Sequence, residues 1–207
     1  MSLFAKRTTL KDIVVKNMIT WSDHILGTKD ELTASAQKEG SYVLTQKQLH
    51  TLWTNLEYFY LIELYLFANK HAQGAVNPEE IGAVISEVYL SYLVHQKKMS
   101  TNDALAKIEE CYGKFSELVL EDATASAQRR ADLDEKSLNY SDIINIASES
   151  FCTKYAYYDS STQKSIESNP GDAYSDGMFD SERVAFKLVR ATVSLISESF
   201  QNSKIVW

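Results

Sequence analysis

Glycine and proline are scarce in this sequence, with seven and two copies among 207 residues. An all-β protein needs a turn roughly every 8–12 residues, and turns are usually built with these two residues. Their scarcity therefore argues against a sandwich or a barrel. Good helix formers such as alanine, leucine, lysine and glutamate are abundant instead. We predict an all-α protein that forms a multi-helix bundle.

Cysteine is also rare, and no long hydrophobic run is present. Cys111 and Cys152 cannot make a disulfide framework, so two buried free thiols in a reducing compartment are expected. The first seven residues lack the apolar core of a secretory signal. The most apolar stretch, 58–68, contains Glu63 and is far shorter than the roughly 20 residues that cross a bilayer. We expect a cytoplasmic protein with no membrane partner.

Basic charge is too sparse for a nucleic-acid binder, because the net charge is −7 and such a protein needs a basic surface. The negative charge is unevenly distributed. Residues 1–99 are balanced, with ten basic and ten acidic side chains. Residues 100–182 hold seven basic and seventeen acidic side chains, whereas residues 183–207 carry a net +3. The second half could attract a basic partner or could simply keep the protein soluble.

Helical periodicity predicts about seven helices in a single domain over residues 1–207. Four of them begin at a recognisable N-cap residue, namely Thr28, Thr45, Asn77 or Ser100. The run 58–68 is apolar nearly all round, which is typical of a central helix. Helices are expected over 9–26, 28–40, 45–72, 78–98, 101–119, 141–155 and 181–200, with a shorter helical stretch over 121–130. Ser141 is expected as a cap, and a polar loop is expected over 157–181.

Two sequence matches suggest an internal duplication of 1–99 in 100–207. The pentapeptide Thr-Ala-Ser-Ala-Gln occurs at 33–37 and again at 124–128. The only prolines, Pro78 and Pro170, both follow asparagine. Two pseudo-symmetric halves would explain these matches, and such an arrangement favours a central groove or a paired site. Chance similarity between Ala/Ser-rich helical turns is the alternative.

Local signatures of chemistry are missing. None of the four histidines has the Glu-x-x-His spacing of a di-iron bundle or the paired spacing of a zinc protease. No glycine-rich phosphate loop and no Gly-x-Ser-x-Gly motif occurs. Acidic residues of the loop at 172, 176 and 180 lack the spacing of a calcium loop. We predict no catalytic residue, no metal site and no cofactor, and an enzyme is the less favoured class.

Two glutamates interrupt apolar helical runs and are the main polar candidates for a site. Glu63 and Glu87 lie on consecutive helices at similar distances from the turn that joins them, so an antiparallel pair would bring them to similar heights. Burial would raise the pKa of each carboxylate and would require a partner, for which Arg190 is the best candidate. Alternatively, each glutamate occupies the solvent-facing strip of its helix.

Aromatic side chains gather on the same two helices. An aromatic ring with a polar tip suits a pocket wall or an interface, although ordinary core packing is the alternative. The candidates for ligand binding or for an interface are Trp53, Tyr58, Tyr60, Tyr65, Tyr89 and Tyr92, together with Glu63, Glu87 and Arg190.

Three hypotheses for function follow. The first is a non-enzymatic protein-interaction or regulatory protein that uses an aromatic patch or the acidic second half. Its partner would be another, basic protein or a second copy of the chain. The alternative is a bundle that binds a small ligand between helices 45–72 and 78–98. The third is an enzyme with a buried Glu63/Glu87 pair.

Overall fold

The computed structural model describes residues 8–27, 29–31, 34, 44–159, 162–166, 180–203 and 205–206. Over these ranges the chain forms seven α-helices, three π-helical segments and four two-residue strands, which confirms the all-α multi-helix prediction. Of the expected helix over 28–40, residues 29–31 and 34 are described, and they are helical. The rest of that stretch, most of the first copy of the repeated pentapeptide, Pro170 and most of the expected loop over 157–181 lie outside the described residues. The duplication therefore stays a prediction.

Helix α1 (Leu10–Trp21) begins at the capping residue Thr9. The Thr9 hydroxyl accepts from the backbone N–H of Asp12, and the Asp12 carboxylate accepts from the backbone N–H of Thr9. This reciprocal arrangement satisfies two amides that the first helical turn leaves without partners. The helix continues into the π-helical segment η1 (Ser22–Leu26), and the helical stretch ends before Gly27, as predicted.

Helix α3 (Gln46–Ala72) is the longest of the described helices. It begins with the same kind of reciprocal cap, here between Thr45 and Gln48. Gln73 and Gly74 then adopt left-handed backbone angles, with φ of 48° and 81°, and so end the helix. The predicted bounds of this helix are confirmed.

The next three helices lead away from α3 and back towards it. Helix α4 (Pro78–His95) is capped by Asn77, and α5 (Thr101–Glu109) is capped by Ser100, as predicted. The π-helical segment η2 (Glu110–Phe115) then joins α5 to α6 (Ser116–Leu133). Helix α6 is longer than the expected 121–130 because a stripe of small buried residues carries it along its neighbour, namely Ala123, Ala127 and Ala131.

One large apolar residue of α5 points away from the bundle. Leu105 is 49% exposed, whereas the preceding Ala104 is completely buried. Neighbouring residues on an α-helix point about 100° apart. Burial of Ala104 against the bundle therefore turns Leu105 outward.

The last two helices are α7 (Tyr140–Ser150) and α8 (Asp180–Gln201), and the π-helical segment η3 (Phe151–Tyr155) extends α7. The predicted cap Ser141 is wrong by two residues. The cap is Asn139, whose side-chain oxygen accepts from the backbone N–H of Asp142 at 3.1 Å. Asparagine and serine serve equally well at this position, so composition alone did not separate them.

Four strands of two residues each are too short to leave a pattern in the sequence. Strand β1 (Thr8–Thr9) pairs in parallel with β4 (Ile205–Val206) and holds the start of α1 beside the end of α8. Strands β2 (Tyr158–Asp159) and β3 (Lys164–Ser165) form a small antiparallel pair after η3.

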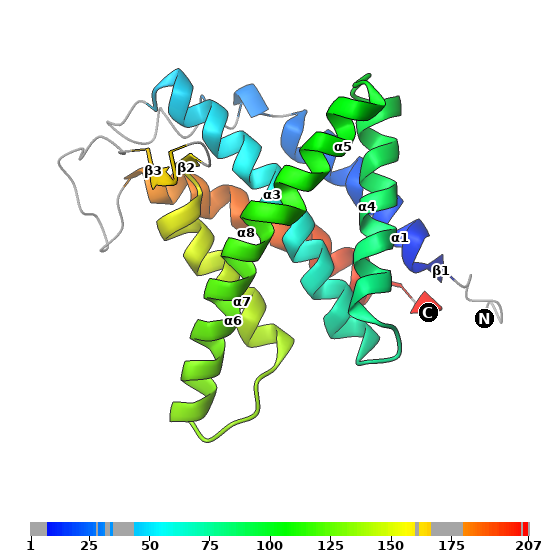
Figure 1. Ribbon diagram of the computed structural model, residues 1–207, viewed down its shortest axis with the longest axis vertical. Coiled ribbons are helices and arrows are strands. Elements are labelled where there is room, and N and C mark those ends of the chain that lie inside the picture. The colour runs from blue at the N-terminus through cyan, green and yellow to red at the C-terminus, as the bar shows by residue number, and fades with distance from the viewer. Residues whose placement is uncertain are drawn as a thin grey trace.

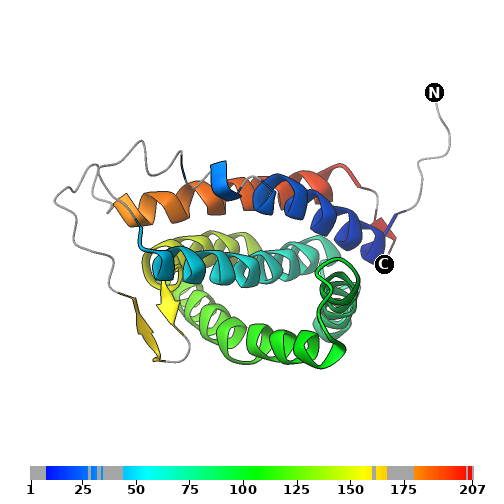
Figure 2. The ribbon, with the colours of Figure 1, turned by 90° about the horizontal axis from the view of Figure 1, so that it is seen from above.

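Helix α3 runs through the middle of the molecule (Figures 1 and 2). Helices α1 and α8 lie together on one side of it, and α5 and α6 lie on the other side (Figure 2). Helices α4 and α7 pack against α3 between these two layers. Helix α6 packs mainly along α7, and this pair of helices extends beyond the rest of the bundle (Figure 1).

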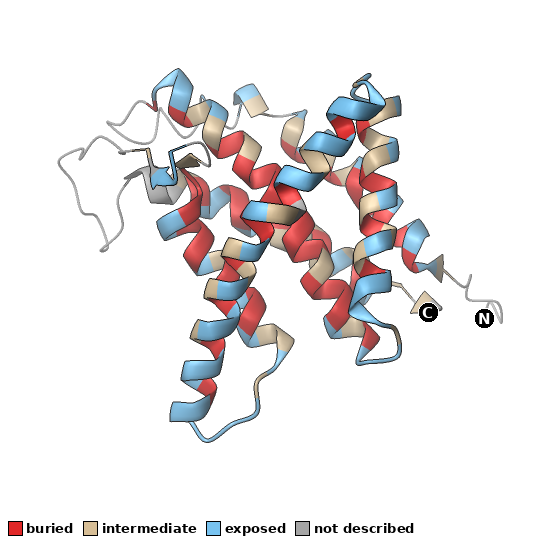
Figure 3. Cartoon of the chain, viewed as in Figure 1, coloured by how far each residue is buried: buried red, intermediate tan, exposed pale blue. Residues whose placement is uncertain are grey.

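The burial pattern agrees with this arrangement (Figure 3). From Tyr58 to Ala68 every side chain of α3 is buried except that of Tyr65. A helix with neighbours on all sides must be apolar all round, which is the pattern predicted for this stretch. Cys111 and Cys152 are both free and buried, as expected.

Buried polar side chains tie three helices together. Asn17 of α1 is completely buried; its amide donates to the Ser199 hydroxyl of α8 at 2.7 Å and accepts from the Tyr60 hydroxyl of α3 at 2.9 Å. The indole N–H of Trp21 donates to the Thr192 hydroxyl at 3.1 Å. These bonds satisfy groups that would otherwise be costly to bury, and they fix the register of α1 against α3 and α8.

Candidate functional site

Glu63 lies at the centre of the bundle with none of its surface exposed. One carboxylate oxygen, Oε1, accepts a hydrogen bond of 3.4 Å from the Ser148 hydroxyl of α7, and Oε2 has no hydrogen-bond partner among the described residues. Burial raises the pKa of Glu63 well above its ordinary value, and the bond from Ser148 opposes that rise. The predicted partner, Arg190, is exposed on α8.

Glu87 has the opposite environment. Its side chain is 64% exposed, and its carboxylate lies 2.7 Å from the Lys11 ammonium of α1. The hypothesis of a buried Glu63/Glu87 pair is therefore wrong. Glu87 is on the outer side of α4, where it pairs with α1, whereas Glu63 contacts α7. Helical rotation, which the spacing from the turn does not specify, separates them.

The predicted aromatic residues do not form a surface patch. Trp53, Tyr58, Tyr60 and Tyr89 are all buried, so the proposal that they make an exposed patch is wrong. Tyr60 stacks on the indole of Trp21, with ring centroids 4.3 Å apart. Only Tyr65 and Tyr92 are half-buried, and they line two separate pockets.

A polar network at the junction of α3, α4 and α5 was not predicted from the sequence. The Glu57 carboxylate accepts from the Tyr89 hydroxyl and from the Lys107 ammonium, both at 2.8 Å. Next to it the Tyr58 hydroxyl donates to Glu110 at 3.1 Å. Burial, and then the adjacent carboxylates, raise the pKa of both Tyr58 and Tyr89, so these hydroxyls stay protonated donors. Glu57 has apolar neighbours on both sides in the sequence, which is the signal that singled out Glu63.

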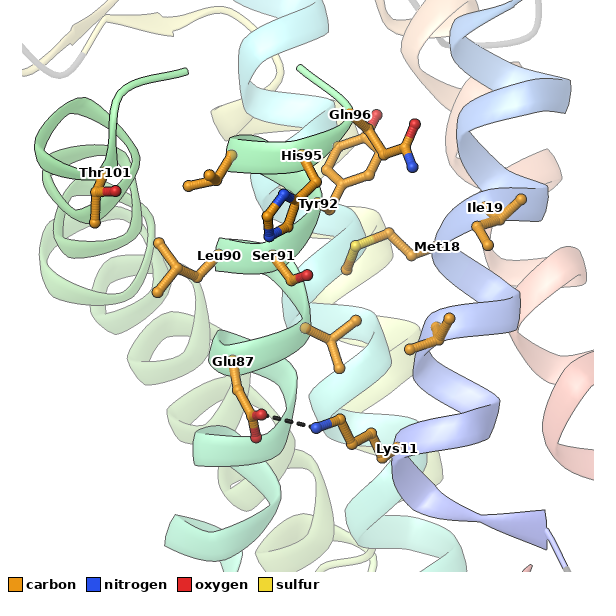
Figure 4. A pocket seen from close by; sticks show the side chains of 13 residues that line it. Lys11, Met18, Ile19, Glu87, Leu90, Ser91, Tyr92, His95, Gln96 and Thr101 are labelled. Carbon is orange, nitrogen blue, oxygen red and sulfur yellow. Dashed lines mark hydrogen bonds and ion pairs between the residues drawn. The ribbon is translucent and has the colours of Figure 1, made fainter. Parts of the chain in front are cut away.

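A groove of about 470 Å³, which we call the α1/α4 groove, follows the contact between those two helices (Figure 4). Val15, Met18 and Ile19 of α1 form one wall. On the α4 side the groove extends over Leu90 and Ser91 to the start of α5, and the Lys11–Glu87 ion pair crosses one end (Figure 4). The remaining lining residues are Val88, Tyr92, Val94, His95, Gln96 and Thr101.

This groove is open and mainly apolar. Most of its lining side chains are exposed, and the completely covered part of its floor is apolar, consisting of Met18 and Val88. Val15 and Ile19 are 39% and 52% exposed, although both are large hydrophobic residues. Exposed apolar side chains that line a groove beside charged residues are typical of a surface that binds another molecule.

A smaller pocket of about 250 Å³ lies between α3, α4 and α6, and we call it the α3/α6 pocket. A pocket between helices 45–72 and 78–98 was predicted, and of the predicted site residues only Tyr65 lines this one. Two exposed carboxylates belong to its lining, Glu79 and Glu117. The other lining residues are Ile62, Pro78, Gly82, Ser116 and Leu120.

Over the described ranges, no group of three or more histidine, cysteine, aspartate or glutamate side chains is arranged to hold a metal ion. Nor does any helix in those ranges have the length and apolar character needed to cross a bilayer. Of the two free thiols, Cys111 has a pKa raised by burial, which removes the thiolate that nucleophilic chemistry requires.

Comparison with known proteins gives no further assignment, since no family model, curated protein or solved structure matches this chain.

Proposed function

We propose that this chain is a non-enzymatic interaction protein and that the α1/α4 groove binds an amphipathic helix of another protein. The observation that carries this proposal is the pair Val15 and Ile19, two large apolar side chains exposed one helical turn apart on the same wall of the groove. Helix α1 already buries a complete apolar face in the bundle. It therefore has a second apolar stripe, which the bundle itself leaves uncovered.

The shape of the groove favours a helical partner. Helices α1 and α4 pack against each other, and side chains of a third helix fit the channel between two packed helices. From Lys11 to Ile19 the wall rises about 12 Å, at 1.5 Å per residue, so a partner helix of two to three turns would cover it. Apolar side chains spaced three and four residues apart would provide the anchors.

The charges at the end of the groove would set the direction of such a helix. Lys11 and Glu87 form an exposed ion pair, and exposed pairs of this kind contribute little to stability. Each charge can therefore exchange its partner for an opposite charge on an incoming helix. The apolar anchors would supply affinity, and the two charges would select the orientation.

A small-molecule ligand suits this groove less well. Small-ligand sites enclose most of the surface of the ligand and place a few polar groups inside. Here the lining side chains are mostly exposed, and both buried members of the lining are apolar. An extended partner covers such a surface better than a compact ligand does.

Site-specific photo-crosslinking tests the proposal. A photoreactive phenylalanine analogue replaces Ile19 in the groove, and in a control protein it replaces Phe186, which is 47% exposed on α8 and outside the groove. We expect Ile19 to capture a defined protein segment with amphipathic helical spacing, and Phe186 not to capture it. Equal capture at both positions, or none at Ile19, would contradict the proposal.

The captured segment is then synthesised and titrated by calorimetry. Ile19→Glu places a charge among the apolar anchors and should weaken binding at least tenfold, whereas Phe186→Glu should not change it. Circular dichroism should show both variants folded, because both positions are exposed. Undiminished binding by folded Ile19→Glu would place the interaction elsewhere.

A further inference from the structure

We infer that the α3/α6 pocket receives a lysine or arginine side chain of a partner protein. This site is separate from the α1/α4 groove, because no described residue lines both. It requires a basic partner segment, whereas the groove requires an amphipathic helix. The two proposals can therefore fail independently.

The interior of the pocket suits an aliphatic stem. Ile62 and Leu120 form apolar walls, and the half-buried ring of Tyr65 contributes a third. Gly82 has no side chain, and a Cβ atom built there would have a single neighbour within 4 Å, the Tyr65 ring at 4.0 Å. Space thus remains beside an aromatic ring, where the methylene groups of lysine or arginine can be buried.

The charged groups of the lining suit the head of the same side chain. Among the described residues of the lining, Glu79 of α4 and Glu117 of α6 are the charged ones, and both are acidic. No lysine or arginine among the described residues forms an ion pair with either carboxylate. A cation held between them would complement both charges and would lie near an aromatic ring.

The chemistry of the lining favours a protein side chain over a free ion. A hydrated metal ion prefers a shell of oxygen ligands, whereas this pocket offers two carboxylates above apolar walls. A lysine or arginine side chain has an apolar stem, which suits the walls, and a charged head, which suits the two carboxylates. The net charge of the sequence agrees, because α6, which contributes Glu117 to the lining, belongs to the stretch 100–182, which holds seventeen acidic and seven basic side chains. Such a field attracts a basic segment over a longer range.

Nuclear magnetic resonance with short blocked peptides tests this inference. The full-length protein, labelled with ¹⁵N, is titrated with acetyl-Gly-Arg-Gly-amide and acetyl-Gly-Lys-Gly-amide at constant ionic strength. The matched probe is acetyl-Gly-norleucine-Gly-amide, which keeps an aliphatic stem and lacks the charge. We expect shifts at the amides of Gly82 and Tyr65, with binding about fivefold to tenfold weaker for norleucine. Equal binding of all three peptides, or no shift at these amides, would overturn the inference.

Two variants and one control make the assignment specific. Glu117→Gln removes one charge, and Gly82→Leu fills the pocket from a position where a Cβ atom is tolerated. Both should abolish the charge-dependent shifts. Glu121→Gln removes an exposed charge of the same helix outside the lining and should leave them. Titration with n-butylamine tests whether the pocket binds a free amine instead of a protein side chain. If this amine saturates the pocket and the peptides do not bind, the inference of a protein partner would also be overturned.

Discussion

The hydroxyl of Ser148 on α7 lies 3.4 Å from Oε1 of Glu63 on α3, and it is the single hydrogen-bond donor to that carboxyl among the described residues. Burial without a cationic partner favours the protonated form of Glu63. The contact between α3 and α7 therefore includes a carboxylic acid whose pKa is higher in the folded chain than in the unfolded chain.

Glu63→Gln should remove a pH dependence of stability. The folded-state pKa is raised above the unfolded value, so the wild type loses stability as the pH rises from about 4.5 towards the folded-state pKa. The variant lacks this loss. Its advantage in the free energy of unfolding should grow by about 1.4 kcal/mol per pH unit within that window. Urea denaturation of both proteins at pH 5.5, 7.0 and 8.5 measures this difference in the free energy of unfolding.

The control for this prediction is Glu87→Gln, because Glu87 is exposed and paired with Lys11 at the surface. Its stability relative to wild type should differ little at any of the three pH values, because exposed ion pairs contribute little to stability. A constant difference between wild type and Glu63→Gln would show that Glu63 is ionised in the folded protein.

Lys107→Met should destabilise the junction of α3, α4 and α5. The substitution keeps the aliphatic stem but leaves the Glu57 carboxylate, which is 11% exposed, with Tyr89 as its remaining hydrogen-bond partner among the described residues. We expect a loss of about 1–3 kcal/mol in the free energy of unfolding. Adding Glu57→Gln should restore part of the loss. The comparable change at an exposed pair, Lys11→Met, should cost less than about 1 kcal/mol.

Asn17→Ala should loosen α1 from both α3 and α8. It removes the acceptor of the Tyr60 hydroxyl and the donor to Ser199, and it leaves a space in a completely buried position. A loss of about 2–4 kcal/mol is expected in chemical denaturation. Asn145→Ala, at an exposed position of α7, should change stability by less than about 0.5 kcal/mol. Similar losses in the two variants would contradict the bridging role of Asn17.

Gly82→Ala should stabilise the protein. Gly82 lies inside α4, where glycine is less favourable than alanine by about 0.5–1 kcal/mol. The added Cβ atom meets only the Tyr65 ring, at an ordinary contact distance of 4.0 Å. A melting temperature raised by a few degrees is expected. A lower melting temperature would mean that the ring cannot accommodate the methyl group.

Sequence periodicity predicted the helices well wherever an N-cap residue directly precedes a segment with apolar residues at helical spacing. Thr45 and Asn77 are examples, since each satisfies backbone amides of its own first turn and needs no distant partner. The site was predicted less well. Glu63 and Glu57 carry the same local signal, an acid within an apolar run, and Glu87 carries it too. The first two are buried against different helices, whereas the third is exposed.

The sequence alone determined the all-helical class, the starts of most described helices and the central place of α3, because these depend on contacts within one turn and on the apolar fraction around a helix. Only the tertiary structure decided which side of each helix meets a neighbour. That rotation placed Tyr58, Tyr60 and Tyr89 in the core, exposed Val15 and Ile19 beside α4, and left Glu79 and Glu117 around an apolar pocket. Packing between helices distant in the chain sets the rotation, and local periodicity contains no information on which neighbour is present.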